Sequence, residues 1–176
     1  MGFMPKLLTR FFILSALAVG AAFVVAASAD AAGTVKVLRS IPFTSVEQVP
    51  AAVRDQCQLQ TKVPEFLAEA AGGSVELVEG PLNRKAGRVL EMEIVDVHSP
   101  GGGAFSGPKW MTVKGELYDG GKQIGSFHAK RSSGGGAFAA YKGTCGIIGR
   151  CTKTLGQDIA TWLASPTANA QLGELH

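Results

Sequence analysis

The chain has 176 residues, of which 46% are hydrophobic and 18% charged, with 17 Lys and Arg against 14 Asp and Glu and a formal net charge of +3. The basic residues form no dense run, so we exclude nucleic acid as a partner, because its phosphates are neutralised by clustered Lys and Arg. The length fits one domain preceded by a short targeting segment.

The first 29 residues have the order of a secretory signal peptide. Lys6 and Arg10 precede an apolar run from Phe11 to Ala26, and Ala27-Ser28-Ala29 is a small-residue site of the kind that signal peptidase cleaves. We expect cleavage after Ala29. The alternative is an uncleaved anchor, because the apolar character extends just far enough to cross a bilayer.

Cleavage would leave residues 30–176 as a single periplasmic domain with short flexible ends. Loss of the two basic residues leaves 15 basic against 14 acidic residues, a net charge of +1. No Cys follows the cleavage site, so a lipoprotein is not expected. Contact with the membrane is then expected only through the signal segment before cleavage.

The first half of this domain predicts a strand and then a helix. Thr34 to Arg39 alternates around two valines, as a strand does. From about residue 50 to Ala71, apolar residues recur every three or four positions, and Gly72-Gly73 ends the pattern. We expect Pro64 to kink or divide this helix, because its ring clashes with the carbonyl one turn earlier.

Four more strands are predicted, at residues 74–79, 88–98, 109–119 and 123–131. Asp119-Gly120-Gly121-Lys122 is a hairpin turn between the last two. If the chain reverses there, paired positions sum to about 241, which places Phe105 opposite Gly136 and Trp110 opposite Arg131.

The last predicted element is a helix with Thr144 as its N-cap, ended by Ser165-Pro166. Its apolar stripe consists of Ile148, Cys151, Leu155, Ile159 and Trp162. A run of strands with one helix before and one after predicts an α+β fold. We expect two layers, with a mainly antiparallel sheet of four to five strands and both helices on one face.

The three cysteines permit at most one intramolecular disulfide in an oxidising compartment. In a continuous last helix, Cys145 and Cys151 lie on different faces, about 9 Å apart along the axis, which is too far for a disulfide. We therefore predict a Cys57–Cys145 disulfide and a buried thiol at Cys151. Two alternatives remain: Cys57 paired with Cys151, or a local bridge between Cys145 and Cys151 if glycines break the first helical turn.

Gly-Gly-Gly-Ala-Phe occurs twice, at residues 101–105 and 134–138. The predicted register puts both loops at one end of the sheet, with Phe105 and Phe138 close together. These glycines either relieve crowding or form a binding rim, since binding residues are often held on loops by a rigid scaffold. The candidate rim residues are Gly102, Phe105, Gly135, Phe138 and Tyr141.

Several catalytic motifs match only in part. Gly134 to Ala139 has the letters of a dinucleotide fingerprint, but no helix opens at its glycines. Ser106-Gly107-Pro108-Lys109 is an S-x-x-K string without the companion motifs of penicillin-binding enzymes, and Pro108 disfavours the helix that carries it there. We interpret it as a coincidence in a loop.

The three histidines, His98, His128 and His176, belong to no spaced motif. Structural roles are expected for His98 and His128. A zinc site of the three cysteines and His128 has enough ligands but lacks a close C-x-x-C pair and competes with oxidation. We therefore predict no metal, no cofactor and no catalytic residue.

Three segments carry a resemblance: Asp55 to Pro64, Ser132 to Phe138, and Thr144 to Cys151 with Leu155 to Ala160. Together they resemble a family of small exported proteobacterial proteins of unknown function. The resemblance implies a Gram-negative periplasm and no catalytic residues.

The resulting functional hypothesis is a non-enzymatic periplasmic protein that binds an envelope protein or a small ligand. The competing hypothesis is an envelope hydrolase that uses Ser106 or a histidine.

Overall fold

The computed structural model describes residues 1–2, 33–134 and 141–175. The chain divides into two units, Met1–Ala31 and Ala32–His176, and every described helix and strand belongs to the second. None of the described helices has the length and apolar character needed to cross a bilayer. The predicted signal segment and Gly135 to Ala140 lie outside the described residues.

The described strands form one sheet in the order β2-β1-β3-β4-β5-β6. The central strands β3, β4 and β5 are antiparallel, whereas β1 pairs in parallel with both β2 and β3, and β6 pairs in parallel with β5. The prediction of a mainly antiparallel sheet of four to five strands is therefore wrong. The strands are β1 Val35–Leu38, β2 Val75–Val78, β3 Arg88–His98, β4 Lys109–Asp119, β5 Lys122–Ser133 and β6 Ala170–Gly173.

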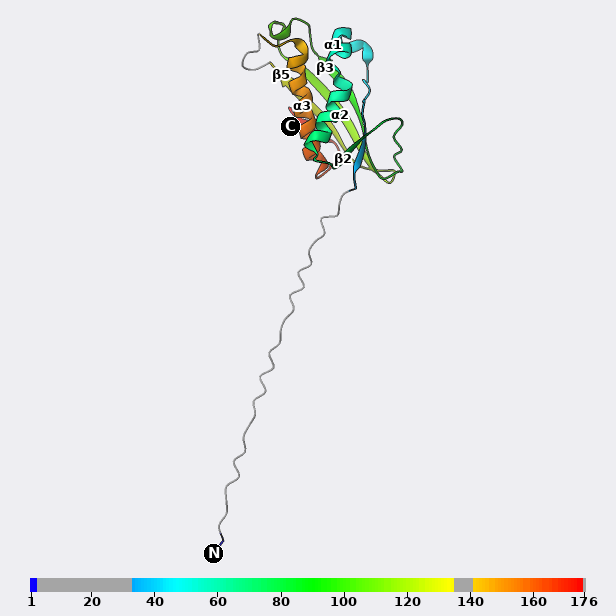
Figure 1. Cartoon of the computed structure of the whole chain (residues 1–176), viewed down its shortest axis with the longest axis vertical. Helices are drawn as coiled ribbons and strands as arrows, with labels where there is room; N and C mark the ends of the chain where they lie inside the picture. Colours follow the sequence, from blue (N-terminus) through cyan, green and yellow to red (C-terminus); the bar gives the residue numbers. More distant parts are fainter. Residues whose placement is uncertain (3–32, 135–140, 176) are drawn as a thin grey trace. The chain divides into compact units, whose positions relative to one another are not determined.

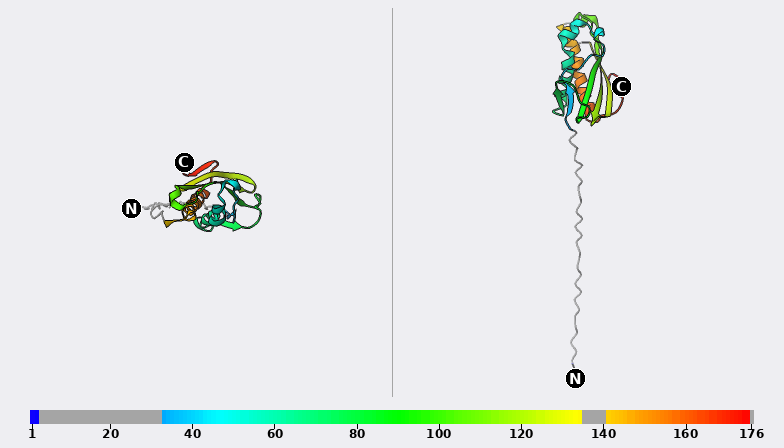
Figure 2. Two further views of the ribbon diagram at one scale, coloured as in Figure 1. Left: turned by 90° about the horizontal axis from the view of Figure 1, so that it is seen from above. Right: turned by 90° about the vertical axis from the view of Figure 1, so that its right-hand side faces the viewer.

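The helices cover one face of this sheet, so the unit has the predicted two layers (Figures 1 and 2). They are α1 Ala51–Cys57, α2 Leu59–Ala70 and α3 Thr144–Leu163, with 3₁₀ turns η1 Val46–Gln48 and η2 Gly103–Ser106. The core lies between the layers, where every residue of the predicted α3 stripe is buried. None of the described helices lies on the opposite face of the sheet (Figure 2).

The first predicted helix is divided, but not at Pro64. The break is at Gln58, which adopts a left-handed conformation with φ 52° between α1 and α2. Pro64 lies inside α2 and is buried. Because proline has no N–H, the carbonyl of Gln60 is left without its helical donor. The N–H of Ile41 donates to it at 3.1 Å and fastens the segment after β1 to the helix.

The β4–β5 hairpin forms at the predicted turn, but its register changes along the strands. Asp119 pairs with Lys122, as predicted, and a bulge follows between Leu117 and Tyr118. The extra residue moves every later pair by one position, so Trp110 lies opposite Ser132 and not Arg131. The predicted pairing is therefore wrong by one residue beyond the bulge.

The predictions for the C-terminal segment and for the N-cap of the last helix also differ from the structure. The C-terminal segment, expected to be flexible, contains β6, which pairs with β5 and is flanked by side-chain contacts to that strand. Ser126 Oγ accepts a hydrogen bond of 2.9 Å from Asn169 N, and the carboxylate of Glu174 accepts one of 2.9 Å from Ser132 N. At the start of α3 the N-cap is Gly143, because the hydroxyl of Thr144 is directed to another segment.

Candidate functional site

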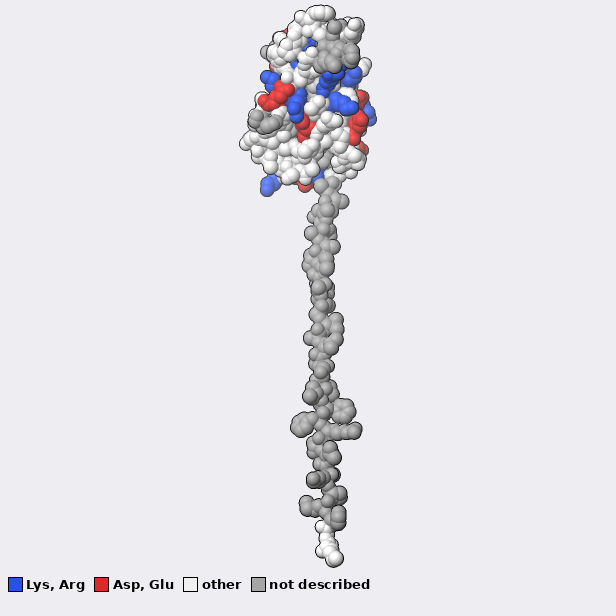
Figure 3. Space-filling model, turned by 90° about the vertical axis from the view of Figure 1, so that its left-hand side faces the viewer, with Lys and Arg blue, Asp and Glu red and all other residues white. Residues whose placement is uncertain are grey.

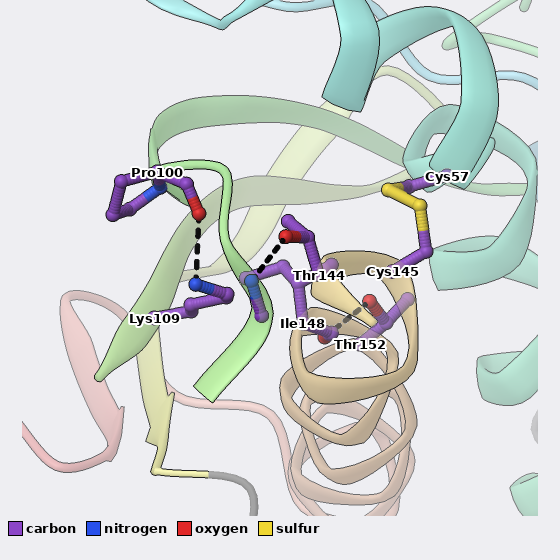
Figure 4. Close-up of a disulfide and its surroundings, with 8 residues drawn as sticks. Cys57, Pro100, Lys109, Thr144, Cys145, Ile148 and Thr152 are labelled. Atoms are coloured by element: carbon purple, nitrogen blue, oxygen red, sulfur yellow. Dashed lines mark hydrogen bonds between the residues drawn. A yellow bond between two sulfur atoms is a disulfide. The ribbon is translucent and has the colours of Figure 1, made fainter. Parts of the chain in front are cut away.

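A disulfide joins Cys57 at the end of α1 to Cys145 in the first turn of α3, with Cα atoms 5.0 Å apart (Figure 4). The structure thus confirms the predicted pairing over both alternatives. The bridge fixes one end of the helical layer beside the loop that precedes β4. Disulfides persist in oxidising compartments, so this bridge indicates an extracytoplasmic protein.

The remaining thiol, Cys151, is buried on the inner face of α3, as predicted. Its Sγ donates a weak hydrogen bond of 3.5 Å to the carbonyl oxygen of Lys109. Burial raises the pKa of the Cys151 thiol to about 11. The thiolate, which is the reactive form, is therefore scarce at neutral pH.

The loop before β4 is fastened to α3 and to the sheet by polar contacts. Thr144 Oγ1 accepts a hydrogen bond of 3.3 Å from Gly103 N, which ties η2 to the first turn of α3 (Figure 4). Gly103 has φ +61°, and a Cβ there would lie 2.8 Å from the carbonyl oxygen of Lys142. A side chain at position 103 would therefore push the loop away from the start of α3.

Lys109, at the start of β4, is fully buried beneath this loop. Its Nζ donates to the carbonyl oxygen of Pro100 at 2.8 Å and to Oγ of Ser106 at 2.9 Å. Desolvation lowers the pKa of Lys109 below its ordinary range. The S-x-x-K string runs from the last residue of η2 to the first residue of β4, and the fold brings its serine and lysine into direct contact.

The rim predicted from the repeated glycines is described only in part. Phe105 and Tyr141 are 87% and 88% exposed, and Gly102 has φ +91°, which favours glycine. Gly135 and Phe138 lie outside the described residues, so the expected proximity of Phe105 and Phe138 stays a prediction. The described part of the rim therefore consists of Gly102 and of two exposed aromatic side chains on separate segments, Phe105 in η2 and Tyr141 shortly before α3.

A groove of about 610 Å³ lies elsewhere, with side chains of β3, β4 and β5 in its lining. We call it the sheet groove. Its apolar lining residues are Leu38, Pro42, Leu82, Met92, Gly115 and Phe127. Its polar lining residues are Arg84, Glu91, Glu93, Lys114, Glu116, Gln123, Ser126, His128 and Asn169.

Two ion pairs fix the charged side chains of the sheet groove. Arg84 forms a bidentate pair with Glu91, at 2.8 and 2.6 Å. Lys114 Nζ lies 2.7 Å from a carboxylate oxygen of Glu93. Glu93 also accepts a hydrogen bond of 2.6 Å from Thr44 Oγ1. These donors lower the pKa of both carboxyl groups, so both are ionised at neutral pH.

An aromatic residue supports the same network. The guanidinium of Arg84 lies 4.3 Å from the ring centroid of Tyr118, and Tyr118 donates to Glu116. The hydrogen bond to Glu116 and burial raise the pKa of Tyr118. Cation–π contact and carboxylate pairing together restrict Arg84 to one orientation.

The histidines have different surroundings. His128 lines the sheet groove, whereas His98 stacks on Trp110 with ring centroids 3.6 Å apart. Among the described residues, neither imidazole forms a hydrogen bond with Ser106. The described residues therefore contain no hydrogen-bonded pair of Ser106 and a histidine to support the hydrolase hypothesis. The basic side chain that contacts Ser106 is Lys109.

The described residues contain no group of three or more His, Cys, Asp or Glu side chains suited to a metal ion. Two of the four ligands considered for zinc, Cys57 and Cys145, are consumed by the disulfide.

Basic and acidic side chains lie interspersed on the face of the molecule shown in Figure 3.

The sequence reasoning missed both the sheet groove and the burial of Lys109. The groove combines residues from distant segments, and no local pattern groups them. For Lys109 a signal existed, because it has the same strand parity as Met111 and Val113, which are both fully buried.

No family model matches the chain, and no curated protein matches it in sequence. A PelC dodecamer from Paraburkholderia phytofirmans is similar in structure, with 14% identity, coverage of 72% of this chain and 88% of that chain, and a TM-score of 0.43. A crystal structure of an uncharacterized protein has 15% identity, coverage of 74% and 92%, and a TM-score of 0.47. These values describe a distant likeness of the chain path and assign no family.

Proposed function

We propose that the protein is a periplasmic binding protein whose ligand, a small polar molecule or a polar segment of an envelope protein, occupies the sheet groove. The observation that carries this proposal is the groove itself, with charged side chains held in place by ion pairs. Its volume, about 610 Å³, is within the range of small-molecule sites.

Preorganisation favours binding in this groove. Glu91 and Glu93 are each held by a basic partner, and Glu93 also by Thr44. Side chains that are already ordered lose little rotamer entropy when a ligand arrives. The groove therefore offers fixed hydrogen-bonding groups at low entropic cost.

The charges of the groove restrict the ligand. Arg84 and Lys114 are basic, whereas Glu91, Glu93 and Glu116 are acidic, so the lining carries one excess negative charge. Such a lining suits a neutral or singly cationic ligand that has several hydrogen-bond donors. The apolar residues of the groove would contact its carbon atoms.

The periplasmic location is part of the proposal. The Cys57–Cys145 disulfide supports a compartment outside the cytoplasm. The signal-like order of the first 29 residues supports export with cleavage after Ala29. N-terminal sequencing of the protein from a periplasmic fraction should begin at Asp30. A full-length chain recovered with the membranes would contradict cleavage.

Native mass spectrometry of protein purified from the periplasm tests the groove. We expect the wild-type protein to carry a small bound species. The Lys114→Ala variant, which lacks the ion-pair partner of Glu93, should no longer carry it. Lys62→Ala, on α2 and outside the groove lining, is the matched control and should retain the species.

A second pair of variants separates charge from packing. Glu93→Gln keeps the shape of the side chain but loses its charge and should also release the species, whereas Glu69→Gln on α2 should not. Wild type that carries no bound species, or a species retained in both groove variants, would overturn the groove as the binding site.

A further inference from the structure

Ser106 and Lys109 lie at the end of β4 opposite the Asp119 turn, and they form an unusual pair. Lys109 is fully buried, yet its two hydrogen-bond partners, the Pro100 carbonyl and the Ser106 hydroxyl, are neutral. Among the described residues, no carboxylate forms an ion pair with it. Burial without an anion favours the neutral amine. A neutral amine has one lone pair that can accept a proton.

The hydroxyl of Ser106 is placed to deliver that proton. Its Oγ lies 3.0 Å from the carbonyl oxygen of Gly103, 3.2 Å from that of Pro100 and 2.9 Å from Nζ of Lys109. Rotation about the Cβ–Oγ bond therefore moves the hydroxyl proton from a carbonyl to Nζ without movement of the main chain. A nucleophile within hydrogen-bond reach of its base is the arrangement that activates serine.

Gly102 leaves the side of Ser106 accessible. A Cβ at position 102 would lie 3.6 Å from Cβ and 3.8 Å from Oγ of Ser106, so a side chain there would cover the hydroxyl. Gly102 is itself exposed to solvent. Within the described residues, the lack of a side chain at Gly102 therefore leaves the half-buried Ser106 hydroxyl open to a reagent from that side.

Two residues close to Ser106 in the sequence, Phe105 and Ser99, have features of a binding site. Phe105, adjacent to Ser106, is 87% exposed and offers an apolar contact beside the hydroxyl. Ser99, next to Pro100, is 1% exposed, and its hydroxyl has no hydrogen-bond partner among the described residues. Buried polar groups without a partner are rare and are often found where a site binds water or a ligand.

We propose that Ser106, with Lys109 as its base, is an activated nucleophile that accepts the acyl group of an ester with an apolar acyl chain. The bond between Oγ and the acyl carbon forms, and the bond from that carbon to the leaving oxygen breaks. The proton passes from Oγ to Nζ and then to the leaving oxygen. The products are acyl-Ser106 and an alcohol, so atoms and charge balance.

This chemistry goes beyond binding in the sheet groove and uses none of its residues. The pH behaviour depends on the surroundings of Lys109. On α3, the titratable residue that contacts Lys109 is Cys151, whose thiol donates to the Lys109 main-chain carbonyl. On β3, the titratable residue at this end of the sheet is His98. On β5, the residue paired with Lys109 is Ser133, whose hydroxyl does not ionise between neutral pH and the ordinary lysine value. Desolvation is the cause that lowers the pKa of Lys109.

A fluorophosphonate probe tests the nucleophile directly, because the Oγ–phosphorus bond forms as fluoride leaves. Peptide mapping should place one label per chain at Ser106, and Ser106→Ala should take up none. Ser74→Ala, which removes an exposed serine between α2 and β2, is the control and should label normally. With p-nitrophenyl butyrate we expect a burst of one p-nitrophenolate per wild-type chain and none from Ser106→Ala.

The role of Lys109 is tested by substitution and by pH. Lys109→Met should slow labelling at least about 100-fold, the usual contribution of a general base. Circular dichroism shows whether this variant folds. If it does not, the wild-type pH profile decides: the labelling rate should level off at a pH below about 10.4, the ordinary lysine value. A rate that still rises at that pH, or label spread over exposed serines, would overturn the proposal, as would the absence of any label.

Discussion

Gly156 lies where α3 crosses α2, and the two helices meet there through their main chains. A Cβ at Gly156 would lie 2.7 Å from the carbonyl carbon of Phe66 and 2.8 Å from N of Leu67. Neither atom can rotate away, so a methyl group forces the helices apart. We expect Gly156→Ala to reduce the free energy of unfolding by about 1–3 kcal/mol, as overpacking does.

Gly149 on the same helix is the matched control. A Cβ there meets no atom within 4 Å. Gly149→Ala should therefore raise the free energy of unfolding by about 0.5–1 kcal/mol through backbone entropy alone. Urea unfolding of both variants measures the two effects, and equal shifts would show that the helices do not meet at Gly156.

Cys151 gives a second prediction for a single residue. Because the pKa of its thiol is raised to about 11, only about one molecule in a thousand carries the thiolate at pH 8. Iodoacetamide should leave the native, oxidised protein unmodified and add one group per chain in guanidinium chloride. Rapid labelling of the native protein would show that the thiol is accessible.

Among the larger elements, the disulfide makes the strongest prediction. Cys57 and Cys145 are 88 residues apart, and closing a loop of that length is worth about 4–5 kcal/mol on the chain-entropy model. Reduction should lower the free energy of unfolding by that order, as measured in urea. The Cys57→Ala/Cys145→Ala variant should be insensitive to reductant. An unchanged midpoint on reduction of the wild type would contradict the entropic account.

Elements that are specified by local patterns could be predicted from the sequence. The stripe on α3 and the alternation on β4 each repeat over enough residues to indicate both the element and its buried face. The disulfide followed from the helix, because a continuous α3 separates Cys145 from Cys151. Each of these predictions needed only the spacing of residues within one segment.

Elements that depend on distant partners could not be predicted. β6 contains one large apolar residue, Leu172, and its place beside β5 depends on contacts of Asn169 and Glu174 with that strand. The left-handed turn at Gln58 directly follows a cysteine that is fixed to α3. The residues of the sheet groove are likewise brought together only by the complete sheet.

For the molecule as a whole, three carboxyl groups predict sensitivity to acid. Salt-bridge and hydrogen-bond donors lower the pKa of Glu91, Glu93 and Glu174. A carboxyl group whose pKa is lower in the folded state stabilises the fold above its unfolded value, about 4.3, and loses that contribution as the pH falls through the folded value. The free energy of unfolding should therefore decrease as the pH falls below about 4.5.

Urea unfolding between pH 7 and pH 3 measures this decrease. Glu93→Gln should flatten the profile, because it removes one of the titrating groups, whereas Glu69→Gln should follow the wild type. If the free energy of unfolding of the wild type stays constant down to pH 3, the contacts of these carboxyl groups do not stabilise the fold.

The ring closed by Cys57 and Cys145 contains α2 and strands β2 to β5, whereas β1 and β6 lie outside it. Under tension applied at the two ends of the chain, the covalent ring therefore bears the force. Only the segments outside it can lengthen, and β6, an edge strand of four residues, can be pulled away without disturbing any other strand pair. The 87 residues between the cysteines add about 300 Å of extension only after the disulfide is reduced. Single-molecule stretching with and without reductant would therefore show two different lengths for the same protein.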